Sequence, residues 1–220
     1  FLVLIASFAH YSWNFLLKRS EDKEIIVWGL LVAASVLLAP VGVLLAWIHP
    51  FEPVAWWFIV ATIVLHTFYF GLLGRSYMEG DLSLVYPIAR GMGPMLVPVL
   101  AVAFLNEAIS VSAIVGIVVI VAGIYTVSWW GNFGLLISHP LSLFSNPSTR
   151  YAILTGLTIA TYTIVDKSGV AHVQPFLYMY LMTLGSAIGL FPYILWKHSL
   201  RGIGQELRSN SVGISVAGSL

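Results

Sequence analysis

Long apolar runs, each about 20 residues in length and separated by short polar clusters, constrain this chain more than any other feature. Of its 220 residues, 59% are hydrophobic and 9% are charged, whereas soluble domains carry roughly 25% charged residues. So few charged residues cannot cover a water-exposed surface, so a soluble enzyme is excluded. The length accommodates about seven to eight membrane helices.

The runs predict an all-α, polytopic helical membrane protein, because backbone groups in hydrocarbon must be paired within the segment and the alternation of barrel strands is missing. The net charge of +1 excludes nucleic acid as a partner, and the lack of cysteine excludes disulfides and thiolate metal sites. No HExxH, GxSxG, GxGxxG or phosphate-loop motif occurs in the sequence. We therefore predict no enzyme, no catalytic residue, no cofactor and no metal site.

The apolar runs give a map of the spans. Membrane helices are expected at 1–17, 25–47, 54–75, 82–105, 111–130, about 147–165 and 175–196, with an eighth beginning at 211. Asn146-Pro147 and Gln174-Pro175 are cap-then-proline signals for helix starts. Because the chain opens without Met and closes inside an apolar stretch, we expect a fragment.

The chain is expected to divide at the Gly- and Pro-containing connector 131–149, into 1–130 and 150–220. Ala9-His10-Tyr11-Ser12 in the first span is similar to Ala160-Thr161-Tyr162-Thr163 in the sixth. Five spans separate the two copies. An odd number of spans makes the second copy enter the membrane from the opposite face, which suits an inverted repeat.

The stretch from Gly80 to Gly91, reading GDLSLVYPIARG, is followed by Pro94, Pro98, Asn106-Glu107 and a helix with Gly116 and Gly123. With Ser12-Trp13-Asn14 in the first span, it resembles the EamA-like repeat of the drug/metabolite transporter superfamily. The resemblance implies ten helices in two inverted repeats of five that move small solutes. It covers a first repeat of five helices at 1–130 and about two and a half helices of a second at 150–220.

Arg90 is the first candidate for binding a substrate. It lies about 13 Å along its helix, near the middle of a hydrocarbon core about 30 Å thick. An isolated charge there costs at least ~2.5 kcal/mol, so the guanidinium must face protein or a water-filled cavity. We expect it to bind an anionic or carbonyl group of a solute; the alternative is a structural arginine paired with neighbouring groups.

The same helix carries Pro87, Pro94 and Pro98, each of which removes the hydrogen bond to the carbonyl four residues earlier. Gly91 and Gly93 let backbone atoms approach a ligand or a neighbouring helix. We expect a kinked helix that supplies carbonyl acceptors and a gate. The alternative is a kink filled by a hydroxyl group or water.

Other candidate substrate-binding residues are polar side chains inside the spans: Tyr11, Asn14, His66, Tyr86 and Tyr162. Tyr11 and Tyr162 occupy matching repeat positions. His66 could carry a proton or be a hydrogen-bonded packing residue, and Asn14 could equally bond a neighbouring helix. Asp166 falls at a helix end, so a carboxylate proton relay is not expected.

We predict a multi-pass protein of the cell membrane, a secondary transporter that moves a small polar or amphipathic metabolite by alternating access. The expected partners are the lipid bilayer, a small-molecule solute and a proton or counter-solute; the small-residue face at Gly185 and Gly189 suits a homodimer or packing within the chain. All Lys and Arg except Arg90 and Lys167 follow odd-numbered spans, which places those loops in the cytoplasm. The alternatives are a structural or assembly subunit of a membrane complex and an intramembrane lipid-modifying enzyme.

Overall fold

The computed structural model describes residues 4, 20–80, 82–106, 108–129, 145–211 and 213–214. The regular elements of this described part are all helices. They are α2 (Lys23–Ile48), α3 (Ala55–Glu79), α4 (Leu82–Leu105), α5 (Val111–Trp129), α7 (Pro147–Gly169), α8 (Pro175–Lys197) and α9 (Leu200–Ser209). The predicted all-α class is therefore confirmed.

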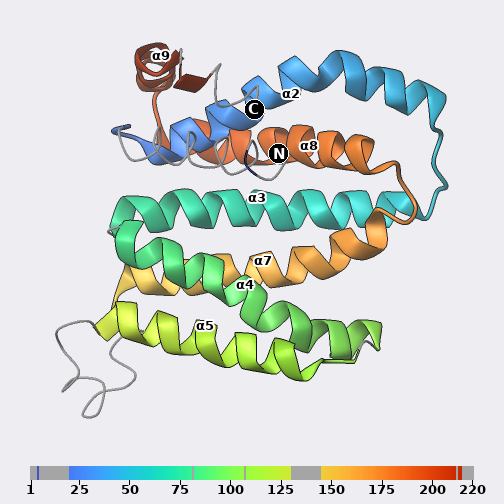
Figure 1. Ribbon diagram of the computed structural model, residues 1–220. Helices are drawn as coiled ribbons and strands as arrows, with labels where there is room; N and C mark the ends of the chain where they lie inside the picture. The colour runs from blue at the N-terminus through green and yellow to red at the C-terminus, as the bar shows by residue number, and fades with distance from the viewer. Residues whose placement is uncertain are drawn as a thin grey trace.

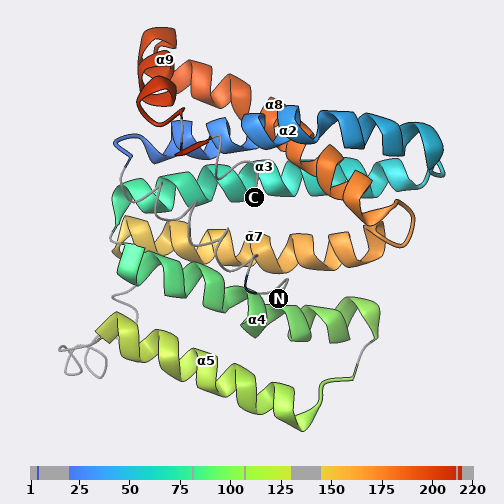
Figure 2. The same ribbon diagram turned by 45° about the horizontal axis from the view of Figure 1, so that its top comes forward.

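The helices pack side by side with α7 at the centre. It lies between α3 and α4, which make the most extensive contacts with it (Figures 1 and 2). On one side α2 and α8 pack together and against α3, and on the other α5 packs against α4. Side chains on α3, α4 and α7 are thereby brought to one interior.

Within the described part of the chain, four helices are long and apolar enough to cross a membrane: α2, α3, residues Val85–Leu105 of α4, and α8. Large apolar side chains cover the outside, and Trp47, Trp57 and Trp196 are largely exposed near helix ends, as in an interfacial belt. The 23-residue α7 is less apolar. Four of its threonines, Thr155, Thr158, Thr161 and Thr163, donate to carbonyls four residues earlier, so these hydroxyls are satisfied within the helix itself.

The helix starts follow local chemistry. Asn146 accepts a hydrogen bond from the Ser148 N–H ahead of Pro147, and Gln174 accepts one from the Leu177 N–H ahead of Pro175. Both predicted cap-then-proline starts are confirmed. Some predicted features fall outside the described residues. They are the first span, of which only residue 4 is described, Asp81, the connector as far as residue 144, and the eighth span beyond residue 214.

The amphipathic helix α9 was not predicted, because residues 197–210 read as a polar loop. Ser199 caps it by accepting a hydrogen bond from the Gly202 N–H, and Ile203 is buried against Ile25 and Ile194. Two packed apolar side chains, Ile203 and Leu207, one turn apart in a short polar stretch, are a weak signal in the sequence. They are nevertheless enough to dock a short helix on the end of the bundle.

Small residues allow close helix contacts. A Cβ atom added at Gly185 would overlap Ile63, and one at Gly189 would meet Thr67 Oγ1 at 2.5 Å, so this face of α8 packs on α3 within the chain. Gly156 of α7 likewise lies against Ala89 and Met92 of α4. The core between α3, α4 and α7 is built around such contacts.

Candidate functional site

Arg90 lies in the second third of α4 and turns its side chain into the interior formed with α3 and α7. Its guanidinium carbon lies 5.8 Å from the ring centroid of Tyr86, one turn earlier on the same helix. It also interacts electrostatically with the phenol groups of Tyr69, Tyr77 and Tyr162. Four tyrosines from three helices therefore interact with one cation, and the ring of Tyr86 favours its positive charge.

Two polar atoms of this cluster lack partners. Among the described residues, neither the buried Nε of Arg90 nor the buried hydroxyl of Tyr77 has a hydrogen-bond partner. A buried polar group without a partner costs about 1–3 kcal/mol. The cluster therefore has unused donor capacity that a solute or water could satisfy. We call Arg90 and these four tyrosines, Tyr69, Tyr77, Tyr86 and Tyr162, the arginine–phenol cluster.

A second polar group adjoins the cluster through Tyr162. The ring of His66 lies 4.0 Å from the Tyr162 ring, centroid to centroid, and its Nε2 lies 4.0 Å from Oδ2 of Asp166. Asp166 accepts hydrogen bonds from the hydroxyls of Thr62, at 2.5 Å, and Tyr178, at 3.0 Å. Three helices, α3, α7 and α8, thus meet at one carboxylate.

The prediction that Asp166 falls at a helix end is confirmed, and its carboxylate also reaches a neighbouring helix. It lies near the end of α7, but its bond to Thr62 places the carboxylate about 10 Å from the start of α3, at 1.5 Å per residue. Helix α7 ends short of the start of α3, so its last turn lies alongside the interior of that helix. The lengths of two helices in the sequence do not show how far one is shifted along the other. The contact between Thr62 and Asp166 could therefore not be predicted.

Helix α4 remains helical through Pro87, Pro94 and Pro98. Its ribbon changes direction part-way along (Figure 1). The space beside its two glycines is filled by other helices. A Cβ at Gly91 would lie 2.8 Å from Ile124 of α5, and one at Gly93 2.9 Å from Ile159 of α7. Gly91 and Gly93 were expected to let either a ligand or a neighbouring helix approach the backbone. In the structure a neighbouring helix lies beside each of them.

Of the six predicted substrate-binding residues, the structure brings together Arg90, Tyr86, Tyr162 and His66. Tyr11 and Asn14 lie outside the described residues. Sequence reasoning did not assign roles to Thr62, Tyr77 or Tyr178. Tyr77 could have been found from its spacing, because it lies two helical turns and one residue after Tyr69 on the buried face of α3.

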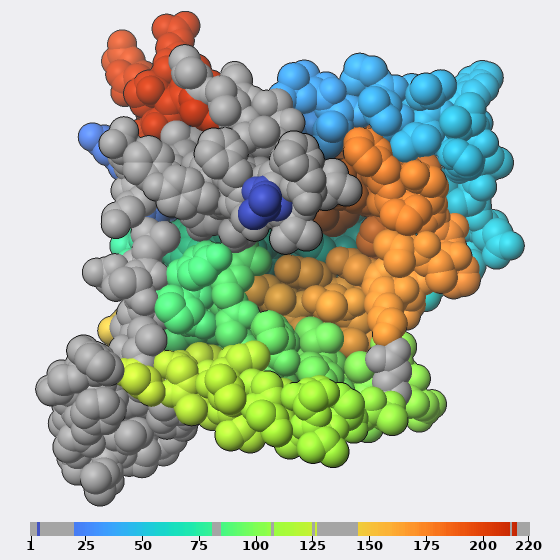
Figure 3. Space-filling view, viewed as in Figure 1, coloured from blue at the N-terminus to red at the C-terminus, as the bar shows by residue number. Residues whose placement is uncertain are grey.

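The surface is hollowed where α7 lies between α4 and α8 (Figure 3). A cavity of about 370 Å³ also separates α3, α7 and α8 nearer the other end of α7, lined by Thr67, Arg75, Tyr151 and Tyr193 among others. The residues that line this cavity do not belong to the arginine–phenol cluster.

The comparisons with known proteins decide the family. The model of the EamA-like transporter family matches residues 1–129, more than half of the chain. The chain belongs to the EamA-like transporter family. Comparison with curated proteins and with solved structures gives no significant match. Together with the apolar helices, membership identifies an integral membrane protein and a transporter of the drug/metabolite superfamily.

The transporter has a further polar cluster, separate from the arginine–phenol cluster and from the His66–Asp166 pair, at the bundle end where α2 starts and α8 ends. Glu24 is 4% exposed and accepts hydrogen bonds from Lys197 and from the Tyr193 hydroxyl, at 3.1 Å. His198 lies 3.3 Å from Glu24 and 3.1 Å from Asp22. These contacts join α2 to α8 by charge.

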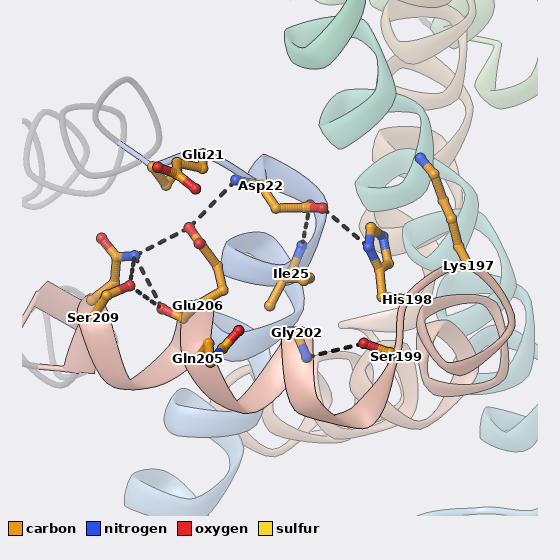
Figure 4. A pocket seen from close by; sticks show the side chains of 12 residues that line it. Glu21, Asp22, Ile25, Lys197, His198, Ser199, Gly202, Gln205, Glu206 and Ser209 are labelled. Atoms are coloured by element: carbon orange, nitrogen blue, oxygen red, sulfur yellow. Dashed lines mark hydrogen bonds and ion pairs between the residues drawn. The ribbon is translucent and has the colours of Figure 1, made fainter.

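A cavity of about 850 Å³ opens beside this cluster, between the start of α2 and α9 (Figure 4). Ligand atoms of Asp22, Glu24 and His198 lie within 4.8 Å of one another. However, Lys197 already neutralises Glu24, and Asp22 caps α2 by accepting from two backbone N–H groups. These contacts favour a structural role for the cluster over a metal site.

Proposed function

We propose that this EamA-like protein is a secondary transporter that moves a small polar or amphipathic metabolite bearing a carboxylate or carbonyl group. The arginine–phenol cluster would hold that group. The observation that carries the proposal is the buried, unpartnered Nε of Arg90, together with the unpartnered hydroxyl of Tyr77 that interacts electrostatically with this arginine, in the part of the chain that the structure describes. A guanidinium binds planar carboxylates through two parallel hydrogen bonds, and phenol hydroxyls can donate to the same anion.

The arrangement of the helices supports alternating access. Arg90 and His66 lie on α4 and α3, whereas Tyr162 and Asp166 lie on α7, which follows the expected connector. We propose that 1–130 and 150–220 form a first repeat and the start of an inverted second repeat, connected by 131–149. Rocking of one repeat against the other would open the shared site to each side in turn. The bend of α4 at Pro87, Pro94 and Pro98 would serve as the gate.

The test is solute uptake by the full-length protein in proteoliposomes, with radiolabelled amino acids and dicarboxylic acids as probes. Arg90→Ala should lower uptake at least tenfold, an effect that corresponds to about 1.4 kcal/mol or more of lost binding in the transition state for transport. Arg90→Lys should retain part of it, because the charge remains while the paired hydrogen bonds are lost.

The matched control is Arg150→Ala, since Arg150 is exposed at the start of α7. It should transport like the native protein. Native uptake that persists in Arg90→Ala would refute the site. A structural subunit would show no uptake with any probe. Because the chain has no cysteine, Tyr162→Cys can also be labelled with a water-soluble thiol reagent, and protection by a transported probe would place the solute at the cluster.

A further inference from the structure

The hydrogen bonds of Thr62 determine which nitrogen of the neutral His66 ring carries a proton. The Thr62 hydroxyl donates its single hydrogen to the Asp166 carboxylate, so toward His66 it can only accept. The Thr62 carbonyl oxygen also can only accept. Both lie 3.0 Å from Nδ1 of His66. Nδ1 must therefore be the protonated nitrogen, and Nε2 has a free lone pair.

That lone pair faces the Asp166 carboxylate. Nε2 and Oδ2 are separated by 4.0 Å, beyond the 2.7–3.2 Å typical of a hydrogen bond. Two acceptors without a hydrogen between them repel each other, which accounts for the gap. One added proton would turn the repulsion into a charge-assisted hydrogen bond.

The protein encloses the histidine of this pair more completely than the carboxylate. His66 is 5% exposed, whereas 26% of the Asp166 side chain is accessible. The titratable or charged groups that face the pair are Tyr69 of α3, Tyr162 of α7 and Tyr178 of α8, with Arg90 of α4 behind Tyr162. These phenols remain neutral in the physiological pH range, so they contribute dipoles and leave the pair to exchange the proton.

We propose that Nε2 of His66 and the carboxylate of Asp166 bind the single proton that drives solute movement through this protein. The inference rests on the proposed transport function and adds the coupling ion. The proton comes from water, adds to the Nε2 lone pair and leaves again to water on the other side, and no covalent bond of the solute changes. Histidine suits this exchange because its ordinary pKa lies near neutrality.

Tyr162 couples the proton to the solute site. It lies one turn before Asp166 on α7, its ring packs on His66, and its hydroxyl interacts with Arg90. Closing the 4.0 Å gap on protonation draws the end of α7 toward α3. The same movement shifts the Tyr162 ring relative to Arg90, so the solute affinity depends on whether the pair holds a proton.

The first experiment measures proton binding without transport. Full-length protein with ¹⁵N-labelled histidine is titrated by NMR, with His66 assigned by its loss in His66→Asn. The expected result is the Nδ1–H form at high pH and the doubly protonated ring at low pH. Asp166→Asn should lower the midpoint by about one pH unit or more, since an opposite charge nearby favours the charged ring. An unchanged midpoint, or the opposite tautomer, would overturn the proposal.

The second experiment separates coupling from transport, with the radiolabelled carboxylates transported by native proteoliposomes as probes. His66→Asn and Asp166→Asn should both lose at least tenfold of the accumulation driven by a pH gradient. Asp166→Asn, which lies outside the arginine–phenol cluster, should retain solute exchange without a gradient. Arg90→Ala should lose both activities, and the control His172→Asn should lose neither. Accumulation that follows a sodium gradient instead, or that persists in both pair variants, would refute the proton site.

The experiments distinguish failure of the proposed transport function from failure of the proposed proton site. Failure of the transport function would abolish exchange and accumulation in the native protein, whereas failure of the proton site would leave accumulation intact in the pair variants. If Asp166→Asn does not fold, Tyr178→Phe is a milder variant that removes one hydrogen bond to the carboxylate. It should shift the NMR midpoint of His66 upward, because a carboxylate that accepts fewer hydrogen bonds attracts the ring proton more strongly. No shift there would count against the pair.

Discussion

Replacing Gly156 by alanine tests the close contact between α7 and α4, the helices that carry Tyr162 and Arg90 of the arginine–phenol cluster. A Cβ atom at this position would overlap the Cβ of Met92 and lie 3.0 Å from the carbonyl oxygen of Ala89. Two carbons in contact are normally about 3.5–4.0 Å apart. The Met92 backbone must therefore retreat by about 1 Å or more, because neither atom belongs to the flexible end of a side chain.

Overpacking of this size costs about 1–3 kcal/mol, and the loss of a helical glycine returns roughly 0.5–1 kcal/mol. Because the overlap with Met92 is severe, the upper part of the overpacking range applies, about 2–3 kcal/mol. The net loss of about 1–2.5 kcal/mol should lower Tm by about 2–10 °C for a chain of this size. Thermal unfolding in detergent, followed by circular dichroism, measures it. Gly116→Ala on α5 is the matched control, since no neighbour lies within 4 Å of its added Cβ among the described residues. Equal Tm values for Gly156→Ala and the native protein would refute the close contact.

Two further predictions concern buried polar groups, and both are measured by the same thermal unfolding. Glu24→Gln should destabilise the fold by about 1–3 kcal/mol because Lys197 loses its charged acceptor at a 4% exposed position, whereas the exposed Glu21→Gln should change stability by less than about 0.5 kcal/mol. Ser186→Ala should leave Tm unchanged or raise it, because the buried hydroxyl has no partner among the described residues. Ser35→Ala should lower it, because that hydroxyl donates to the Leu31 carbonyl at 2.7 Å; the reverse order of the two serine variants would contradict the reasoning.

The sequence predicted the helices well because length, apolarity and capping act locally. The span expected at 82–105 matches α4, and the starts at Pro147 and Pro175 agree with the structure. Arg90 was identified by a local argument too, since a charge in hydrocarbon needs protein or water around it wherever it lies. Local reasoning was sufficient for each of these features.

Contacts between helices could not be read in the same way. Nothing in the order of residues shows that Asp166 reaches Thr62, because that contact depends on where α7 ends relative to α3. The same holds for Tyr77 of α3, whose role follows from its electrostatic interaction with Arg90 of α4. The sequence also left open which partner packs against Gly185, since a face of small residues can pack against its own chain or a second copy. In the structure Ile63 of α3 packs against it.

The candidate site joins parts of the chain that differ in their relation to the family. Arg90 and His66 lie within residues 1–129, which match the EamA-like family, whereas Tyr162 and Asp166 follow that segment. Each pair is incomplete by itself: the cation and the imidazole come from one part, and the stacking ring and the carboxylate from the other. A movement between the two parts therefore changes both the arginine–phenol cluster and the His66–Asp166 pair at once. This shared dependence is the physical requirement for coupling one ion to one solute.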